Sequence, residues 1–325
     1  MRPVDIAGRL LDRLGILDPL IRRTGGRYVM AYHRVLSPAE ALSEWCHPAI
    51  WITPQTFEAH LKYFSRVGRI VPLRDLLDAP DDGGPLFSLT FDDAWQDNYV
   101  HAVPIMAAHA ATACFFVPTD AVSSGRLFWT EELALKLGEA LTGPRRDALL
   151  AHLGWPAGSV AELLPRVMSH VEGLKDLEVV ARERAIAALY SAFAIPTAPV
   201  QGRVMNWDQI RELAALGHSI GSHSKTHLIL RGVDRARVDE ELVESKQIVE
   251  RELSRSVDYF CFPNARYDDL SSERVLAAGY SHGFRIHNLK VKRDSHRALV
   301  PRFSASENNS LPSHLKLRFA RASLA

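Results

Sequence analysis

The chain has 325 residues, of which 47% are hydrophobic and 24% are charged, and its formal net charge is +1. This length is enough for one large domain with an insertion, and the nearly neutral charge gives no electrostatic reason to expect nucleic-acid binding. The three cysteines, Cys46, Cys114 and Cys261, are odd in number and widely spaced. They indicate neither a disulfide framework nor a cysteine metal cluster. Cys114 and Cys261 lie in apolar strand-like runs, which favours core packing for these two, and a reducing compartment is expected.

Residues 1–27 are predicted to form an N-terminal amphipathic helix. Apolar residues recur at helical spacing with basic residues between them: Val4, Ile6, Leu10, Leu11, Leu14, Leu17, Leu20 and Ile21, with Arg9, Arg13, Arg22 and Arg23. Such a helix either packs on the rest of the fold or rests on an anionic membrane face. The segment has no uninterrupted apolar stretch or cleavage site typical of a signal peptide, and no segment approaches the length of a transmembrane helix.

Strand-like and helical segments alternate over residues 28–122 and 205–305, which we assign to one discontinuous domain. The predicted strands are 27–32, 69–73, 85–91, 111–117, 218–222, 257–262 and 280–284. The predicted helices are 53–67, with Thr53 as N-cap and Pro54 at the first position, 97–110, 239–253 and 271–278. This alternation predicts parallel strands joined by helical crossovers.

Residues 123–204 interrupt this rhythm, because they are rich in Leu, Ala, Glu and Arg and show no strand-like alternation. Helices are predicted over 130–141, 145–153, 159–171 and 177–193, separated by proline- and glycine-containing breaks. We therefore expect an all-helical insertion that shapes a pocket. A basic helix is predicted over 306–325, where Leu315, Leu317 and Phe319 alternate with Lys316, Arg318 and Arg321, and it adds some support to the membrane alternative.

Two motifs carry chemistry. The strand 85–91 ends at Thr90-Phe-Asp-Asp93, and the strand 218–222 ends at His223-Ser-Lys-Thr-His227. Two imidazoles and one carboxylate form the ligand set of a catalytic zinc site, which keeps one position open. A divalent ion lowers the pKa of bound water to about 7, and the second carboxylate can accept the proton of that water. The two motifs together predict a mononuclear metal hydrolase.

In these motifs the chain resembles the polysaccharide deacetylase (NodB-homology) family of carbohydrate esterases. The resemblance is carried by Leu89-Thr-Phe-Asp-Asp93, Gly217-His-Ser-Ile-Gly-Ser-His-Ser-Lys-Thr-His227, Phe260-Cys-Phe-Pro-Asn264 and the early Tyr32-His-Arg-Val35. It implies an α/β fold, a distorted (β/α) barrel, and metal-dependent removal of N-acetyl groups from amino sugars. It also implies that Asp93, His223 and His227 are metal ligands and that Asp92 is the general base.

The third motif departs from the family pattern. Many relatives have an arginine two residues before the proline that corresponds to Pro263, and that arginine braces the base. This chain has Cys261 there, so Arg302 and Arg266 are the candidates to replace it. A backbone N–H of the loop after Pro263, at Asn264, is expected to stabilise the oxyanion of the reaction.

The proton donor for the departing amine is assigned to His33. In many relatives this histidine stands near the C-terminus, but the late histidines here lack that context, whereas His33 ends a predicted strand. The chain therefore resembles the permuted members of the family. A histidine suits the task because its ordinary pKa of about 6.5 lies near working pH. Trp129, which opens the insertion, either stacks on a sugar or lipid or anchors the insertion to the barrel.

The leading hypothesis is thus an N-deacetylase with one divalent ion, zinc being favoured by the mixed ligand set. Its expected substrate is an N-acetylated sugar in a surface-glycan precursor, either nucleotide-linked or lipid-linked, on the cytoplasmic side. An anionic inner membrane face is a further expected partner. The alternatives are a C–N hydrolase for a non-sugar amide or imide, and a catalytically inert carbohydrate-binding barrel.

Overall fold

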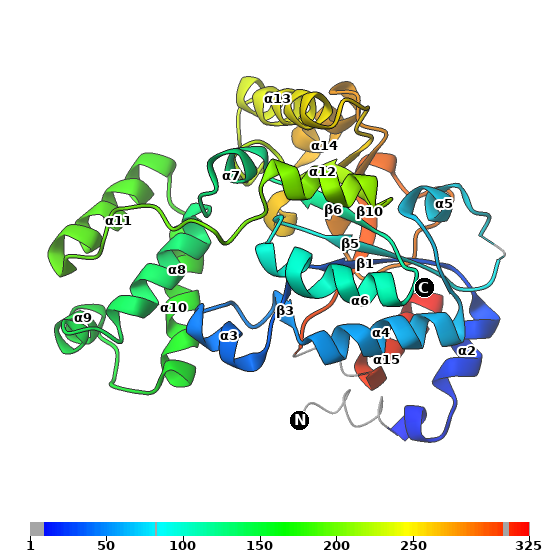
Figure 1. Ribbon diagram of the computed structural model, residues 1–325, viewed down its shortest axis with the longest axis horizontal. Coiled ribbons are helices and arrows are strands. Elements are labelled where there is room, and N and C mark those ends of the chain that lie inside the picture. Colours follow the sequence, from blue (N-terminus) through cyan, green and yellow to red (C-terminus); the bar gives the residue numbers. More distant parts are fainter. Residues whose placement is uncertain (1–9, 82, 308–311, 325) are drawn as a thin grey trace.

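Seven parallel strands form a closed ring in the computed structural model, which describes residues 10–81, 83–307 and 312–324 (Figure 1). In ring order the strands are β1 (Arg27–Tyr32), β10 (Val300–Ser304), β9 (His282–Ile286), β8 (Tyr259–Cys261), β7 (Ser219–Ser222), β6 (Ala113–Val117) and β5 (Leu86–Phe91), and β5 pairs with β1 to close the ring. The short β4 (Arg69–Ile70) pairs with the start of β5. The expected (β/α) barrel is confirmed.

The strands are stable because both faces of the sheet are covered by other side chains. Every residue of β1, β5 and β6 is buried, as expected for parallel strands with helices outside and side chains filling the interior. The interior cluster includes Cys114, Phe116, Cys261 and Phe284. Cys114 and Cys261 are buried free thiols, so the prediction of core packing is confirmed for these two.

Helices surround the ring. They are α4 (Pro54–Val67), α5 (Leu73–Asp78), α6 (Val103–Ala108), α12 (Trp207–Ala215), α13 (Arg235–Leu253) and α14 (Asp269–Ala277). Thr53 caps α4 as predicted, because its hydroxyl accepts a hydrogen bond from the Thr56 N–H. The helix expected over 97–110 is divided into a π turn, η1 (Asn98–Ala102), and α6. Pro104 lies just after the junction, where its missing N–H interrupts the regular ladder.

The terminal segments differ from the prediction of one amphipathic helix over 1–27. Residues 10–13 are helical, Gly15 then adopts a left-handed φ of 68°, and a second helix, α2 (Leu17–Thr24), follows. Glycine tolerates that conformation, so Gly15 can separate the two helical segments. Residues 1–9 lie outside the described part. In α2, Leu17 and Ile21 are buried against the barrel, as in the packed alternative.

The C-terminal helix α15 (Pro312–Leu324) packs on the outside of the barrel, beside α2 and next to α4. Leu315 and Phe319 are fully buried, and the Phe319 ring lies 4.7 Å from that of Tyr28. Lys316 pairs with Asp12 at 2.5 Å and Asp18 at 3.2 Å. Because these apolar side chains are buried in the core, α15 does not support the membrane hypothesis.

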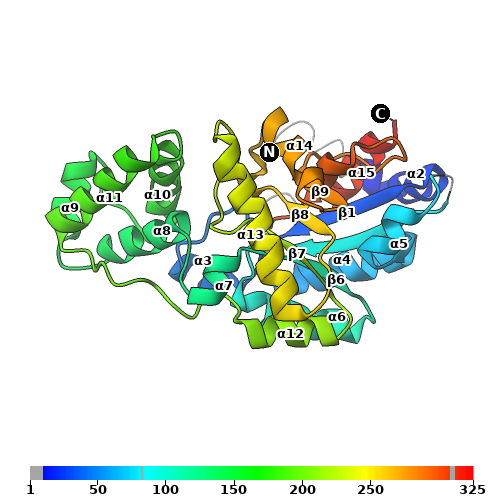
Figure 2. The ribbon, with the colours of Figure 1, turned by 90° about the horizontal axis from the view of Figure 1, so that it is seen from above.

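The insertion is all-helical, with α8 (Trp129–Ala140), α9 (Arg146–Leu153), α10 (Val160–Leu174) and α11 (Val179–Phe193). Figure 2 shows these helices as a lobe on one side of the barrel, near α3 (Pro38–Ser43) and α7 (Thr119–Ser124). The lobe has its own hydrophobic cluster, to which Trp95 of the barrel contributes. Because the insertion follows β6, it lies at the end of the barrel where the strands finish. No described helix has the length and apolar character needed to cross a bilayer.

Candidate active site

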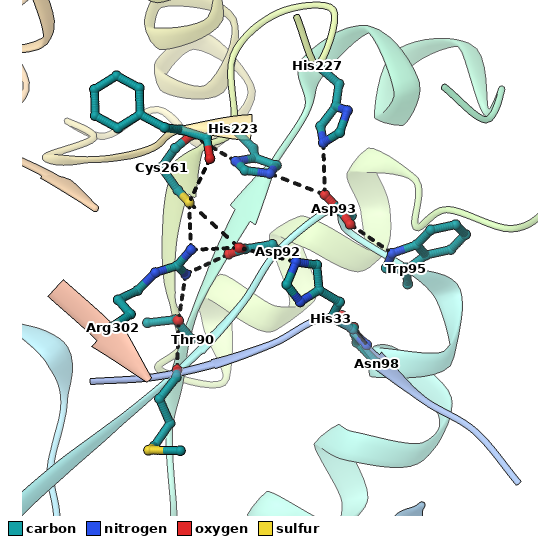
Figure 3. A network of polar contacts seen from close by, with 12 residues as sticks. His33, Thr90, Asp92, Asp93, Trp95, Asn98, His223, His227, Cys261 and Arg302 are labelled. Atoms are coloured by element: carbon teal, nitrogen blue, oxygen red, sulfur yellow. Dashed lines mark hydrogen bonds and ion pairs between the residues drawn. The ribbon is translucent and has the colours of Figure 1, made fainter. Parts of the chain in front are cut away.

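The motif residues meet where the strands end. His33 follows β1, the two aspartates follow β5, and His223 follows β7 (Figure 3). The strand register aligns Tyr32 with Phe91, and the Asp92 N–H donates to the Tyr32 carbonyl at 3.0 Å. His33 and Asp92 are therefore neighbours across two strands, at the barrel end where enzymes of this architecture place reactive groups.

A sharp backbone turn sends the two adjacent carboxylates in different directions. Asp93 has a φ of 76° and Ala94 a φ of 55°, both in the left-handed region that non-glycine residues seldom occupy. Such strain persists only when the surroundings hold it, and it is concentrated at functional sites. Here the turn lets Asp92 point toward β10 while Asp93 points toward the two histidines (Figure 3).

Asp93, His223 and His227 form a compact triangle. Asp93 Oδ1 lies 3.2 Å from Nε2 of each histidine. His223 Nδ1 lies 2.8 Å from the Cys261 carbonyl, so that nitrogen must donate and Nε2 of the neutral ring keeps its lone pair. His227 stacks on Phe128, with ring centroids 4.3 Å apart. Asp93 Oδ2 accepts a hydrogen bond from the Trp95 indole at 3.2 Å.

This triangle fits a divalent ion. Its ligand atoms lie within 4.8 Å of one another, and Asp93 Oδ1 is buried without a hydrogen-bond partner among the described residues. A buried polar atom without a partner is costly unless something else satisfies it. Burial acts to raise the pKa of Asp93, but the neighbouring imidazoles hold it well below its ordinary value. An ionised carboxylate with two imidazoles is a donor set that suits zinc.

Asp92 is held by Arg302. The guanidinium donates Nη1 to Oδ1 at 2.8 Å and Nη2 to Oδ2 at 2.7 Å, and Nη1 also donates to the Thr90 hydroxyl. Both side chains are almost fully buried. Burial acts to raise the pKa of Asp92, but the charge and hydrogen bonds of Arg302 more than offset it, so the pKa is lowered. Asp92 is therefore an ionised carboxylate at neutral pH and can accept a proton.

Arg302 also reaches the residue that stands in place of the family arginine. Its Nη2 lies 2.8 Å from the Cys261 Sγ, and burial raises the pKa of that thiol well above its ordinary value. Arg266, the other candidate, pairs instead with Glu172 at 2.5 Å and Asp176 at 3.3 Å on the insertion. Of the two arginines, Arg302 is the one that contacts Asp92.

His33 faces Asp92, with Nε2 3.7 Å from Oδ2 and the side chain 20% exposed. Its Nδ1 has no hydrogen-bond partner among the described residues. The Asn98 amide donates to the His33 carbonyl at 2.6 Å. Arg34 donates to Asp97 at 2.9 Å, and Asp97 also accepts from the Val35 N–H. These hydrogen bonds hold the backbone after β1 in place without involving the His33 imidazole. They give the arginine of Tyr32-His-Arg-Val35 a structural role.

The remaining predicted residues lie near the end of the barrel where the strands finish. Asn264 has a left-handed φ of 53°, and its side chain accepts a hydrogen bond from Lys175 of the insertion at 2.8 Å. Trp129 packs against the insertion cluster, with Arg182 over its ring at 4.4 Å, as in the anchoring alternative. Sequence reasoning missed the contacts of Trp95 and Phe128 with Asp93 and His227, although Trp95 stands only two residues after Asp93.

The chain is similar to polysaccharide deacetylases in part of its sequence and in its fold. Residues 179–283 match the family described as polysaccharide deacetylase, a stretch that contains His223 and His227. The Streptococcus pyogenes deacetylase PplD, in complex with acetate, has a TM-score of 0.58 and 16% identity, over 89% of this chain and 96% of that chain. IcaB from Ammonifex degensii has a TM-score of 0.57 and 17% identity, over 93% and 98%. No curated protein sequence matches the chain. The predicted resemblance is confirmed, and the shared fold is established.

Proposed function

We propose that this chain, which has the polysaccharide deacetylase fold, is a metal-dependent hydrolase that removes an N-acetyl group from an amino sugar. The observation that carries the proposal is the joint arrangement of two carboxylates. Asp93 lies 3.2 Å from the Nε2 atoms of His223 and His227, while its neighbour Asp92 is held ionised by Arg302. One carboxylate is thus available as a ligand and the other as a base.

Asp93, His223 and His227 would hold the ion. When bound, a divalent ion supplies a Lewis acid for the acetamide carbonyl and lowers the pKa of a bound water. The ion pair with Arg302 keeps Asp92 ionised, so a carboxylate oxygen is free of a proton when the substrate arrives. Asp92 would take one proton from the attacking water.

His33 would complete the reaction by donating a proton to the nitrogen of the departing amine. The C–N bond then breaks, the water oxygen remains in acetate, and the sugar keeps a free amine. Asn264 would contribute its backbone N–H to the oxyanion. The next two N–H groups of that loop, those of Ala265 and Arg266, already donate to the carbonyls of Phe262 and Pro263.

The direct test is acetate release by the purified protein from N-acetylglucosamine, its oligomers and nucleotide-linked or lipid-linked N-acetyl sugars. Acetate and a free amine should appear in equal amounts. A protein that binds these sugars but releases no acetate from any of them is the inert barrel. Release of a product only from non-sugar amides or imides would support the C–N hydrolase alternative.

His33→Ala is expected to lower kcat and kcat/KM together, by on the order of a hundredfold to ten-thousandfold, without changing metal content. The reason is that a proton donor for the amine acts only in the transition state. The loss should be much smaller on an activated ester of acetate, whose leaving group needs no proton. Steady-state kinetics on both substrates measure the difference.

His282→Ala provides the matched control, because His282 lies at the start of β9, the opposite end of the barrel. This variant should retain its kcat. Equal losses of His33→Ala on the amide and the activated ester would make His33 a structural residue.

We further propose that the substrate is a precursor of a surface glycan, and that residues 10–16 contact an anionic membrane face. Leu10, Leu14 and Ile16 are 57%, 62% and 46% exposed, and Arg13 beside them is also exposed. Exposed apolar side chains beside basic ones favour weak, reversible binding to an anionic bilayer. The protein should sediment with anionic vesicles and not with neutral ones.

Replacing Leu10, Leu14 and Ile16 together by serine should abolish that sedimentation. Replacement of Leu177, Val179 and Val180, which are similarly exposed on the insertion, should leave it unchanged. Equal recovery with both vesicle types would remove the membrane part of the proposal and leave the catalytic part intact.

A further inference from the structure

A partly open cavity of about 200 Å³ lies next to the active site, between the barrel and the insertion. Its walls include Trp45, Trp95, Glu131, Met168, Lys175 and Asn264. Trp95 connects the cavity to the chemistry, because its indole also donates to Asp93. The volume is below the roughly 300 to 1,000 Å³ of pockets for drug-sized ligands. A space of this size suits a single sugar ring rather than a run of linked sugars.

Contacts between the barrel and the insertion close one side of this cavity. Lys175 donates to the Asn264 side chain at 2.8 Å, and Arg266 pairs with Glu172 and Asp176. These contacts join α10 and the residues just after it to the loop that follows β8. On this side the cavity is therefore bounded by paired side chains, which a sugar chain continuing in this direction would have to displace.

The cavity wall holds a carboxylate that the proposed reaction does not use. Glu131 lies in the first turn of α8, and its neighbour Thr130 donates a hydrogen bond to it. Burial raises the pKa of Glu131. Glu131 lines the cavity together with Trp95, whose indole donates to Asp93. A carboxylate offers two acceptor oxygens, whereas sugar hydroxyls are donors. Thr130 satisfies only part of that accepting capacity.

We propose that the substrate enters by a single terminal N-acetylated sugar, whose ring occupies this cavity and whose hydroxyls donate to Glu131. This inference rests on the proposed function and narrows its substrate class. Monosaccharides on a carrier and chain ends are accepted, and internal residues of a polymer are not. Glu131 acts as a specificity residue that binds the sugar and takes no part in proton transfer.

The positional test uses a pentamer of N-acetylglucosamine labelled at its reducing end. Mass spectrometry of the fragments locates each deacetylated residue. Loss of acetyl from one terminal residue only is the expected result. Deacetylation of internal residues would overturn the inference while leaving the deacetylase function established. Absence of acetate from the pentamer and from all other N-acetyl sugars would instead remove the proposed function itself.

The residue test uses Glu131→Gln. Loss of hydrogen bonds to a charged acceptor should raise KM for the sugar substrate by roughly 10- to 100-fold, with kcat and metal content close to those of the wild type. Glu131→Asp should recover part of the affinity. Glu132→Gln is the matched control, because Glu132 is adjacent in α8 but pairs with Lys136, and its KM should not change. A fall in kcat with unchanged KM, or equal effects at Glu131 and Glu132, would overturn the role of Glu131.

Discussion

His223→Ala is expected to abolish metal binding and acetate release together while the barrel stays folded. The substitution removes one of three ligand atoms that converge within 4.8 Å. It also leaves the Cys261 carbonyl without its imidazole donor, at a cost of roughly 1 to 3 kcal/mol. This cost is smaller than the 5 to 15 kcal/mol stability of a typical domain. Metal content by elemental analysis and folding by circular dichroism measure the two effects separately.

His101→Ala is the control for this experiment, since His101 is a partly exposed histidine whose partner is Glu40. It should bind one zinc ion per chain, as we expect of the wild type. Chelation of the wild type should abolish acetate release, and added zinc should restore it. Full metal occupancy in His223→Ala would contradict the ligand assignment, even if activity were lost.

Asp92→Asn is expected to keep the metal and lose most turnover, by on the order of a hundredfold to ten-thousandfold. Asparagine has a similar shape and can still accept a hydrogen bond from Arg302, but it cannot accept the proton of the water. The variant also leaves the Arg302 charge buried without its partner, and breaking a buried pair costs roughly 3 to 5 kcal/mol. The melting temperature must therefore be measured beside kcat and zinc content.

A pH profile of Arg302→Met separates a chemical role of Asp92 from a structural one. The ion pair lowers the pKa of Asp92, and burial alone would raise it. Without Arg302, protonation of the base begins at higher pH, so the acidic limb of the kcat profile should move upward. Near-normal turnover of folded Asp92→Asn at saturating substrate, or an unmoved acidic limb in Arg302→Met, would contradict the assignment of Asp92 as base.

Several features could be predicted from the sequence because they depend on short segments. The apolar run before Asp92 has the length of a strand, and it forms the fully buried β5. Thr53 and Pro54 mark the start of α4 through local hydrogen bonding and a preset φ. The spacing of His223 and His227 suggested their convergence on one point, and the structure brings both rings to Asp93 Oδ1.

The partners of those residues could not be predicted, because they come from distant segments. Arg302 lies 210 residues from Asp92, and only closure of the ring brings β10 and the end of β5 within reach. Neither Arg302 nor Arg266 has a local signal that distinguishes them. Likewise, the apolar residues of α15 have the pattern of a surface-binding helix, but Phe319 is buried between α15 and the outer face of the barrel.

The sequence by itself therefore determined elements such as β5 and α4, together with the reactive residue types, since periodicity and motif spacing are properties of neighbouring residues. Tertiary structure alone decided which charge stabilises the base and where the substrate cavity lies. The ionised state of Asp92 depends on a guanidinium brought in by strand pairing. The cavity beside Asp93 depends on contacts between the insertion and the loop after β8. Both arise from packing between segments that are far apart in the chain, and no local sequence pattern shows that such segments meet.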